Sequence, residues 1–101
     1  MRFANDVGFC ELNDFPGCNV IVVSNHAFIY PDKRGKGHGH KNHELRVERA
    51  KYLGYDLIMC TVRANNIAEK KILTKHKWKL LHTFNNKQTS NAVELWVKDL
   101  T

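Results

Sequence analysis

The stretch PDKRGKGHGH, residues 31–40, constrains the fold of this chain more than any other part of the sequence. It combines three glycines, three basic side chains and two histidines. Residues 19–30, NVIVVSNHAFIY, precede it and predict a central strand, because the first half is apolar on both faces. A helical pattern follows over residues 39–53, and Gly54 stands where a left-handed C-terminal cap is expected. A loop that leads from a strand into a helix presents free backbone N–H groups, which favour an anion.

Strands and helices alternate along the rest of the chain. A buried strand is expected over residues 56–62, so the unit from 19 to 62 should be a right-handed crossover between parallel neighbours. The sequence therefore predicts an α/β fold, with a central mixed sheet and helices on its faces. The other expected elements are a strand at 7–12, a turn at 13–17, a second helix from Asn65 or Asn66 to about His76, and an antiparallel hairpin of strands 78–84 and 92–100. The inward side chains are expected to be His43, Val47 and Ala50 on the first helix, and Ala68, Ile72 and Leu73 on the second.

Length and composition indicate one globular domain, residues 1–101, without a membrane span or a signal peptide. A cytoplasmic protein is the natural expectation. Cys10, Cys18 and Cys60 are odd in number and match no zinc or redox spacing, so we expect free thiols. The net charge of +6 favours anionic partners.

The spacing of the glycines narrows the kind of anion. A Walker loop and a dinucleotide-binding fingerprint both require spacings that residues 31–40 lack. The pattern R-x-x-G-x-G does fit, with Arg34, Gly37 and Gly39 in the defining places. Glycines allow close approach of the backbone to a phosphate, and Arg34 and Lys36 add cationic donors. We therefore expect a phosphate or pyrophosphate cradle.

This loop resembles the acyl-coenzyme A loop of the GNAT (Gcn5-related) N-acetyltransferases. The resemblance covers roughly residues 19–100. It includes AFIYPDKRGKGHG at 27–39, NNIAEKKILTKHKW at 65–78 and the final hairpin. It implies a GNAT-like acyl-CoA N-acyltransferase fold and transfer of an acetyl group from acetyl-CoA to a primary amine. Acetyl-CoA, the co-substrate, would lie in a wedge between strands 19–30 and 56–62.

The resemblance also implies which residues contact the coenzyme. A backbone N–H near Ala27 would contact the thioester carbonyl, and the pantetheine would pair with the backbone of Ala27 and Ile29. From the second helix, Asn65 or Asn66 and Lys70 or Lys71 could reach the coenzyme. The pyrophosphate would lie on the N–H groups of Gly35, Gly37, His38, Gly39 and His40, with Arg34 and Lys36 beside it.

The sequence departs from the family at the general base and acid. The place of the frequent glutamate base falls near Val23, and that of the frequent tyrosine acid near Leu73. Asn25 and His26 are candidate substitutes, and the ordinary pKa of histidine, ~6.5, suits a base. Strict strand alternation, however, directs His26 to the opposite face. Tyr30 and Tyr55 are weaker candidates for the acid.

Histidines mark a second departure, because positions 38, 42 and 43 are commonly aliphatic in the family. Here they are His38, Asn42 and His43. His40 and His43 lie three residues apart on one helix, a spacing that metal sites use. No carboxylate or cysteine stands at a ligand spacing except Glu44, which points elsewhere. We therefore expect a solvated or core-satisfied histidine cluster and no metal.

Only residues 1–18 precede the region of resemblance, where the family usually carries a strand and one or two helices. The acceptor site is therefore expected to be open, completed by a partner or a second copy, or lost. A homodimer would pair through the exposed end of the sheet or through the 76–100 hairpin. An open site favours a macromolecular acceptor, such as a protein lysine or N-terminus, over a small metabolite.

Two other functions stay open at this stage. A catalytically inactive module that binds CoA or only a protein is consistent with the missing base and acid. A nucleic-acid-binding protein is the other alternative, but its aromatic side chains fall on expected core faces and its cations are spread along the chain. The contacts for that alternative would be Lys33, Arg34, Lys36, Lys41 and Arg46 on phosphates, with Trp78 or Phe84 stacking on bases.

Overall fold

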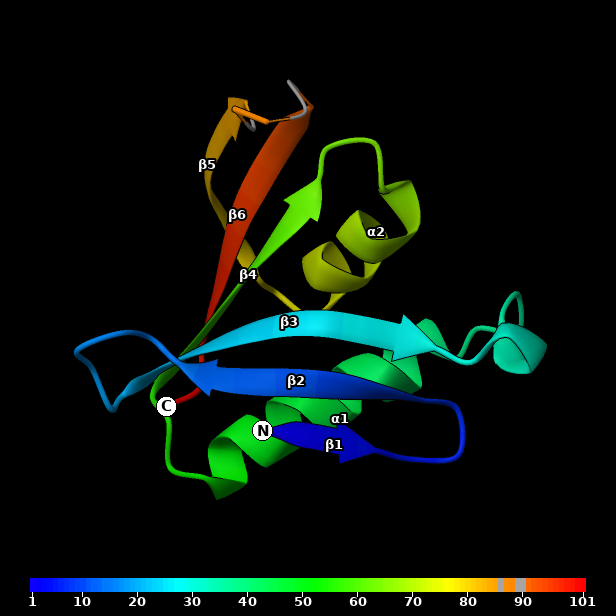
Figure 1. Ribbon diagram of the computed structural model, residues 1–101, viewed down its shortest axis with the longest axis horizontal. Helices are drawn as coiled ribbons and strands as arrows, with labels where there is room; N and C mark the ends of the chain where they lie inside the picture. The colour runs from blue at the N-terminus through cyan, green and yellow to red at the C-terminus, as the bar shows by residue number, and fades with distance from the viewer. Residues whose placement is uncertain (86, 89–90) are drawn as a thin grey trace.

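The computed structural model describes residues 1–85, 87–88 and 91–101; of His26 it describes the backbone only. Two α-helices and six strands make up the described part (Figure 1). The elements, in chain order, are β1 (Arg2–Ala4), β2 (Gly8–Asp14), β3 (Ile21–Ile29), a short 3-10 helix (Pro31–Lys33), α1 (Gly39–Tyr52), β4 (Leu57–Arg63), α2 (Ile67–Lys75), β5 (Lys79–Asn85) and β6 (Ala92–Asp99).

The strands form one mixed sheet in the order β1-β2-β3-β4-β6-β5. Among the strands of the described residues, only β3 and β4 run parallel, and the other neighbouring pairs are antiparallel. The expected crossover from β3 through α1 to β4 and the expected C-terminal hairpin are both confirmed. A parallel pair joined by a helix and flanked by hairpins is the α/β mixed sheet that the sequence predicts.

The two parallel strands pair over a short distance and then diverge. Ile21 to Val23 lie opposite Leu57 to Met59, and no pairing follows beyond these residues. Past that point β3 remains paired with β2, whereas β4 remains paired with β6 along its whole length. The sheet therefore splits, and α2 lies beside the opening (Figure 1). We call the opening bounded by β3 from Ser24 and by β4 from Cys60 the wedge.

A compact apolar cluster joins the sheet to both helices. The C-terminal end of α1 contributes Ala50, and α2 contributes Leu73, both fully buried. Trp78 and Trp96 complete the cluster from the C-terminal hairpin region, each less than 8% exposed. The strands supply Leu12, Val22, Ile58, Cys60, Val62 and, after β6, Leu100. The cluster fixes the start of the wedge, because Val22 and Ile58 lie directly opposite each other.

Three details differ from the sequence-based expectations. The short strand β1 was not expected; it pairs antiparallel with β2. Ala68 is exposed rather than inward, whereas Ile72 and Leu73 are buried. Arg46, assigned only to a surface role in nucleic-acid binding, is 3% exposed. Trp78, the stacking residue of the same alternative, is 4% exposed and belongs to the core, which agrees with the expectation that the aromatic side chains fall on core faces.

The capping predictions agree with the structure. Gly54 has φ 87°, the left-handed conformation expected at the end of α1. Asn66, rather than Asn65, is the N-cap of α2, and its side-chain oxygen accepts a hydrogen bond from the Glu69 N–H at 3.2 Å. Neither described helix is both long and apolar enough to cross a membrane.

Candidate functional site

The glycine-rich loop lies at the open end of β3 and forms the wall of a cavity of about 410 Å³, which we call the loop cavity. Gly35 and Gly37 have φ values of 76° and 77°, and an added Cβ at either would meet open space. Gly39 approaches α2, because a Cβ there would lie 2.7 Å from Cδ1 of Ile72. The cavity is lined by Ile29, Lys33, Arg34, Gly35, Gly37, His38, Gly39 and His40, and by Ala68, Lys71 and Ile72 of α2.

The first turn of α1 faces this cavity without a competing anion. No acidic residue stands in that turn, and the His38 N-cap makes no side-chain capping bond. An α-helix leaves its first N–H groups unsatisfied, and they carry the positive end of the helix dipole. Positive-φ glycines therefore lead into an uncapped helix start, and this backbone arrangement favours an anion.

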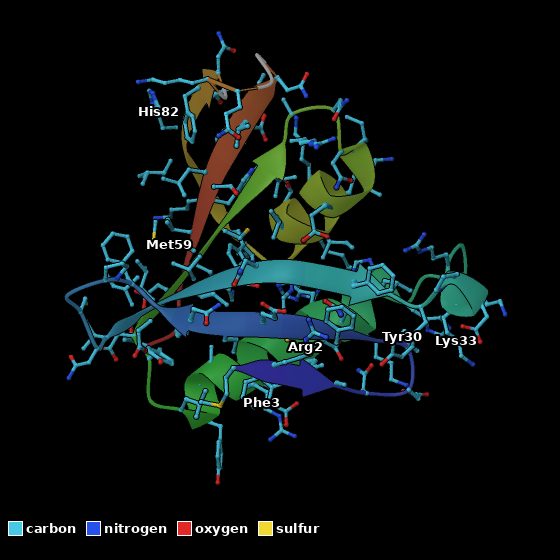
Figure 2. The ribbon with its side chains drawn as sticks, in the orientation of Figure 1. Arg2, Phe3, Tyr30, Lys33, Met59 and His82 are labelled. Carbon is cyan, nitrogen blue, oxygen red and sulfur yellow. The ribbon has the colours of Figure 1, made fainter. Side chains whose placement is uncertain are left out.

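Arg34 braces the loop against β3 in the present arrangement. Its Nε donates to the Ile29 carbonyl oxygen at 3.0 Å, and its guanidinium lies 4.8 Å from the centre of the Phe28 ring. Lys36 is exposed and does not line the loop cavity, whereas Lys33 does. Tyr30 and Lys33 lie at this loop end of β3, distant from His82 on β5 (Figure 2).

The second helix contributes one of its two expected lysines to the loop cavity. Lys71 lines the loop cavity. Lys70 instead donates to the Ala64 carbonyl at 3.1 Å and forms an ion pair with Glu94 at 3.1 Å. Asn65 is exposed and lines neither cavity, and Asn66 lines the wedge.

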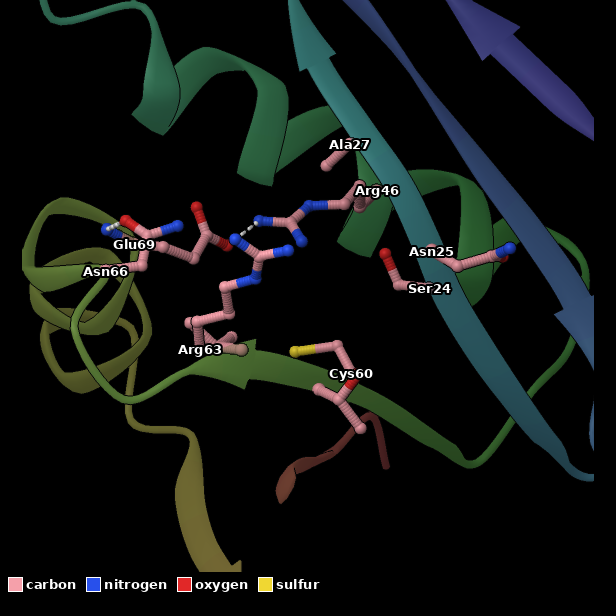
Figure 3. A pocket seen from close by; sticks show the side chains of 10 residues that line it. Ser24, Asn25, Ala27, Arg46, Cys60, Arg63, Asn66 and Glu69 are labelled. Carbon is pink, nitrogen blue, oxygen red and sulfur yellow. Dashed lines mark hydrogen bonds and ion pairs between the residues drawn. The ribbon is translucent and has the colours of Figure 1, made fainter. Parts of the chain in front are cut away.

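The wedge contains a second cavity, of about 450 Å³, whose walls come from both diverging strands and both helices (Figure 3). Ala27 and Asn25 both line it, and Asn25 accepts a hydrogen bond from Asn13 at 2.8 Å. The other lining residues are Ser24, Arg46, Cys60, Thr61, Val62, Arg63, Asn66 and Glu69.

No titratable side chain stands at the two places where the family usually has its base and acid. Val23 pairs with Met59 inside the sheet, and Leu73 is fully buried in the core. Tyr55 precedes β4, and its hydroxyl donates to Asp14, a contact that raises the pKa of the tyrosine. Tyr30 packs against Phe9 and Phe28. The His26 side chain lies outside the described groups, so its role as a base stays a prediction.

The charged side chains of the wedge were not expected from the sequence. Arg46 of α1 donates to Glu69 of α2 at 2.7 Å, and this ion pair joins the two helices at the wall of the wedge cavity. Arg63, at the end of β4, extends into the same space (Figure 3). The available signal was the spacing of His43, Arg46 and Ala50, which places Arg46 on the inward face of the helix.

Asn42 and His43 have specific partners in the interior. The Asn42 amide donates to the Phe9 carbonyl at 3.0 Å, next to the irregularity in the β2–β3 pairing. His43 is 2% exposed, and its Nε2 accepts a hydrogen bond from the Trp78 indole at 2.8 Å. Burial, with a smaller contribution from the Arg46 charge, lowers the pKa of His43 to about 3. These contacts explain polar residues at two positions where aliphatic ones were expected.

His76 connects the remaining histidines of this cluster. Its ring stacks on His43 at 4.1 Å between centres, and its Nε2 lies 3.2 Å from Nδ1 of His40. No group of three or more metal-ligating side chains occurs among the residues that the structure describes. The three cysteines are free, and burial raises the pKa of Cys60, at the wedge, to about 12.

Comparison with solved structures identifies the fold. An N-acetyltransferase from Staphylococcus aureus matches at a TM-score of 0.80 and 20% identity, over 94% of this chain and 61% of that one. The ribosomal-protein-S18-alanine N-acetyltransferase from Escherichia coli matches at 0.78 and 12% identity, over 100% and 69%. Spermidine N-acetyltransferase from Vibrio cholerae, in complex with CoA and spermine, matches at 0.78 and 15% identity, over 93% and 58%. The chain has the GNAT fold.

The GNAT match extends over nearly the whole chain, yet the chain spans about 60% of the length of most of the GNAT structures it matches. No protein-family model matches the sequence, and no curated protein is similar to it in sequence. One matched GNAT structure, from Salmonella typhimurium, contains acetyl-CoA. The likeness is therefore one of fold.

Proposed function

We propose that the protein is a GNAT-type N-acetyltransferase that moves an acetyl group from acetyl-CoA to a primary amine. The observation that carries this proposal is the pairing of two adjacent cavities along β3. Ile29 lines the loop cavity and Ala27 lines the wedge, so one extended molecule can follow the strand edge between them. Beyond Val23 no described strand pairs with that edge of β3, so a pantetheine arm could bind its backbone groups, with the Ile29 carbonyl first released from Arg34.

The glycine loop suits the diphosphate end of the coenzyme. Gly35 and Gly37 leave open space above the backbone, and the uncapped start of α1 favours negative charge. Lys33 and Lys71 supply cations at the cavity wall. Arg34 would keep its contact with Ile29 or turn its guanidinium toward a phosphate, since the side chain is exposed.

Transfer would proceed by direct attack in a ternary complex. The uncharged amine nitrogen forms a bond to the acyl carbon, the C–S bond breaks, and the proton of the amine ends on the CoA thiol. Deprotonating an amine of pKa ~10.4 at pH 7 costs about 4–5 kcal/mol, which a base or a water chain must help to supply. Placement of the two reactants and a backbone N–H near Ala27 aimed at the thioester oxygen would lower the remaining barrier.

The acceptor we favour is an amine on a protein or peptide. β5 is exposed along its whole length, so the C-terminal hairpin offers surface to a macromolecular acceptor. The matched structures include enzymes named for a protein N-terminal alanine and for a polyamine, so they do not discriminate between these classes. An acceptor site completed by a second copy of the chain belongs to the same proposal.

A catalytically inactive CoA-binding module is the second candidate. It is favoured by Val23 and Leu73, which cannot titrate where the family usually has its base and acid. Nucleic-acid binding is less well supported, because Arg46 is engaged in a buried ion pair and Trp78 in the core. Of the two aromatic side chains considered for stacking on bases, Phe84, which is 42% exposed, is the accessible one.

The decisive experiment measures CoA binding by calorimetry and thiol release from acetyl-CoA with a lysine-rich peptide. Gly37→Val should abolish CoA binding, because a β-branched side chain at φ 77° is strained and projects into the cradle. Gly17→Val is the matched control: Gly17 also has φ 77° and open space, but lies in the β2–β3 turn. CoA affinity that survives Gly37→Val would refute the cradle. Saturable CoA binding without thiol release would refute the enzyme and leave the inactive module.

A further inference from the structure

The wedge contains two buried polar atoms that lack a hydrogen-bond partner among the described residues. They are Oγ of Ser24 and Nε of Arg46, in side chains that are 4% and 3% exposed. Both residues line the wedge cavity. Buried polar groups in native proteins are nearly always paired, so an orphaned hydroxyl and an orphaned guanidinium N–H indicate a site for a polar ligand or for water.

The charge of the wedge indicates what kind of ligand fits. Arg46 and Arg63 carry two positive charges, and Glu69 carries one negative charge, which leaves the lining with a net charge of +1. The Arg63 side chain extends toward the Arg46–Glu69 pair (Figure 3) and makes no hydrogen bond or ion pair with a described residue. Cys60 adds no charge, because burial raises the pKa of its thiol to about 12. One monovalent anion would therefore neutralise the cavity.

Glu69 holds the guanidinium of Arg46 in place for such an anion. Its contact with Arg46 at 2.7 Å uses one NH2 group and leaves Nε without a partner. A guanidinium binds a carboxylate through parallel N–H donors, and a nearby hydroxyl can donate a further hydrogen bond. Ser24 supplies that hydroxyl from the opposite wall, on β3.

We propose that the wedge is a carboxylate subsite, in which Arg46, Arg63 and Ser24 bind a carboxylate group of the substrate. The role of this subsite rests on the proposed function. If acetyl-CoA binds as proposed, the carboxylate lies next to the thioester, because Ala27 lines the same cavity. The carboxylate would belong either to the acyl chain of a CoA thioester, as in a succinyl group, or to the amine acceptor. The subsite would thus select among acyl donors or among acceptors.

Binding of a free carboxylate tests the subsite without any catalysis. The arginine Nε–H signals of ¹⁵N-labelled protein are followed while propionate, or the isosteric but neutral propionamide, is added. Propionate should shift the Arg46 and Arg63 signals saturably, and propionamide should not. Arg63→Gln should weaken propionate binding about tenfold, the effect of losing one charged hydrogen bond. Arg49→Gln removes the same charge from the exposed outer side of α1 and should leave the affinity unchanged.

Ser24→Ala provides a second variant that tests the buried hydroxyl, and circular dichroism verifies that each variant is folded. The subsite is refuted if propionate causes no saturable shift, if propionamide binds equally well, or if Arg63→Gln binds propionate like the unmodified protein. In those cases the orphaned atoms are satisfied by water alone.

Thiol release then identifies the source of the carboxylate. Acetyl-CoA and succinyl-CoA are compared with hexylamine as the acceptor, and hexylamine is compared with 6-aminohexanoate with acetyl-CoA as the donor. A preference for succinyl-CoA that is lost in Arg63→Gln assigns the carboxylate to the acyl donor. A preference for 6-aminohexanoate that is lost in Arg63→Gln assigns it to the acceptor. Turnover without either preference overturns the assignment to substrate. Absence of all turnover refutes the proposed function, while the propionate titration still decides the subsite.

Discussion

Burial of His43 predicts that the protein loses stability on mild acidification. The ring is 2% exposed and accepts the indole hydrogen bond of Trp78 at Nε2, so its single proton is on Nδ1. A second proton on Nε2 would break that bond and place a charge in the interior. The neighbouring cations oppose the charge further; after burial, Arg46 has the largest effect, followed by His76, Lys98 and His40. Together these effects lower the pKa of His43 to about 3.

The magnitude follows from the difference between the folded and unfolded states. In the unfolded chain a histidine has a pKa of ~6.5. Between that value and about 3, the unfolded state binds a proton that the folded state does not, so stability is full above the unfolded pKa and falls as the pH falls. From pH 7 to pH 5 the loss is about 2 kcal/mol. The pKa of His76 is lowered as well, mainly by burial and by His40, and shifts stability in the same direction.

Urea unfolding at pH 7 and pH 5 measures this loss, with His43→Leu as the test and His82→Leu as the control on the exposed strand β5. The unmodified protein and His82→Leu should lose about 2 kcal/mol more on acidification than His43→Leu does. With a urea dependence of ~1 kcal/mol per molar, the transition midpoints should differ by about 2 M in their response to pH. If His43→Leu loses as much stability as the unmodified protein, His43 is not the buried neutral group described above.

Two further changes test the packing around the wedge. Glu69→Ala should lower the free energy of unfolding by about 3 kcal/mol, because it leaves the buried Arg46 without its carboxylate. The control Glu48→Ala, on the exposed face of α1, should change the free energy of unfolding by less than about 0.5 kcal/mol. Equal effects of the two substitutions in urea unfolding would contradict a structural ion pair. Gly8→Ala should lower the stability of the protein more than Gly17→Ala does. A Cβ at Gly8 would lie 1.9 Å from the Phe28 carbonyl oxygen, whereas a Cβ at Gly17 would meet open space and carry only the left-handed φ penalty of about 1 kcal/mol. Thermal unfolding compares the stabilities of the two variants. A Gly17→Ala variant that is less stable than Gly8→Ala would contradict the β2–β3 register.

The order of elements and most of their boundaries could be predicted because each element has a local signal. The strand at 21–29 follows a turn with Pro16 and Gly17, and α1 ends at Gly54 in the left-handed conformation that its position predicts. β1 carries no such signal: a strand of three residues is too short to show alternation, and it forms because β2 offers a free edge. The helical spacing predicts an inward Ala68, but alanine fits either environment, so its residue type does not determine its burial and the side chain is exposed.

The two halves of the candidate site differ in how far the sequence could predict them. The loop depends on backbone geometry, which glycines at 35, 37 and 39 indicate directly through their spacing. The wedge depends on side chains from four separate elements that only the fold brings together. Arg46 and Glu69 lie 23 residues apart in the sequence, and neither residue type indicates the other as its partner.

Sequence patterns predict the burial of the polar face of α1 poorly, although this burial has a physical cause in the fold. The helical spacing places His43 inward, but nothing in a pattern of apolar residues predicts burial of Asn42 or of the charged Arg46, yet all three are at most 3% exposed. Each faces a group that an aliphatic side chain could not satisfy: a β2 carbonyl next to a pairing irregularity, the Trp78 indole, and the Glu69 carboxylate. Only Arg46 also adjoins the opening of the sheet, so the polar interior that stabilises the helix extends at that residue into the cavity where a substrate would bind. Structural and binding roles therefore meet at one side chain, and the exposed Arg63 is the position at which the binding role can be removed alone.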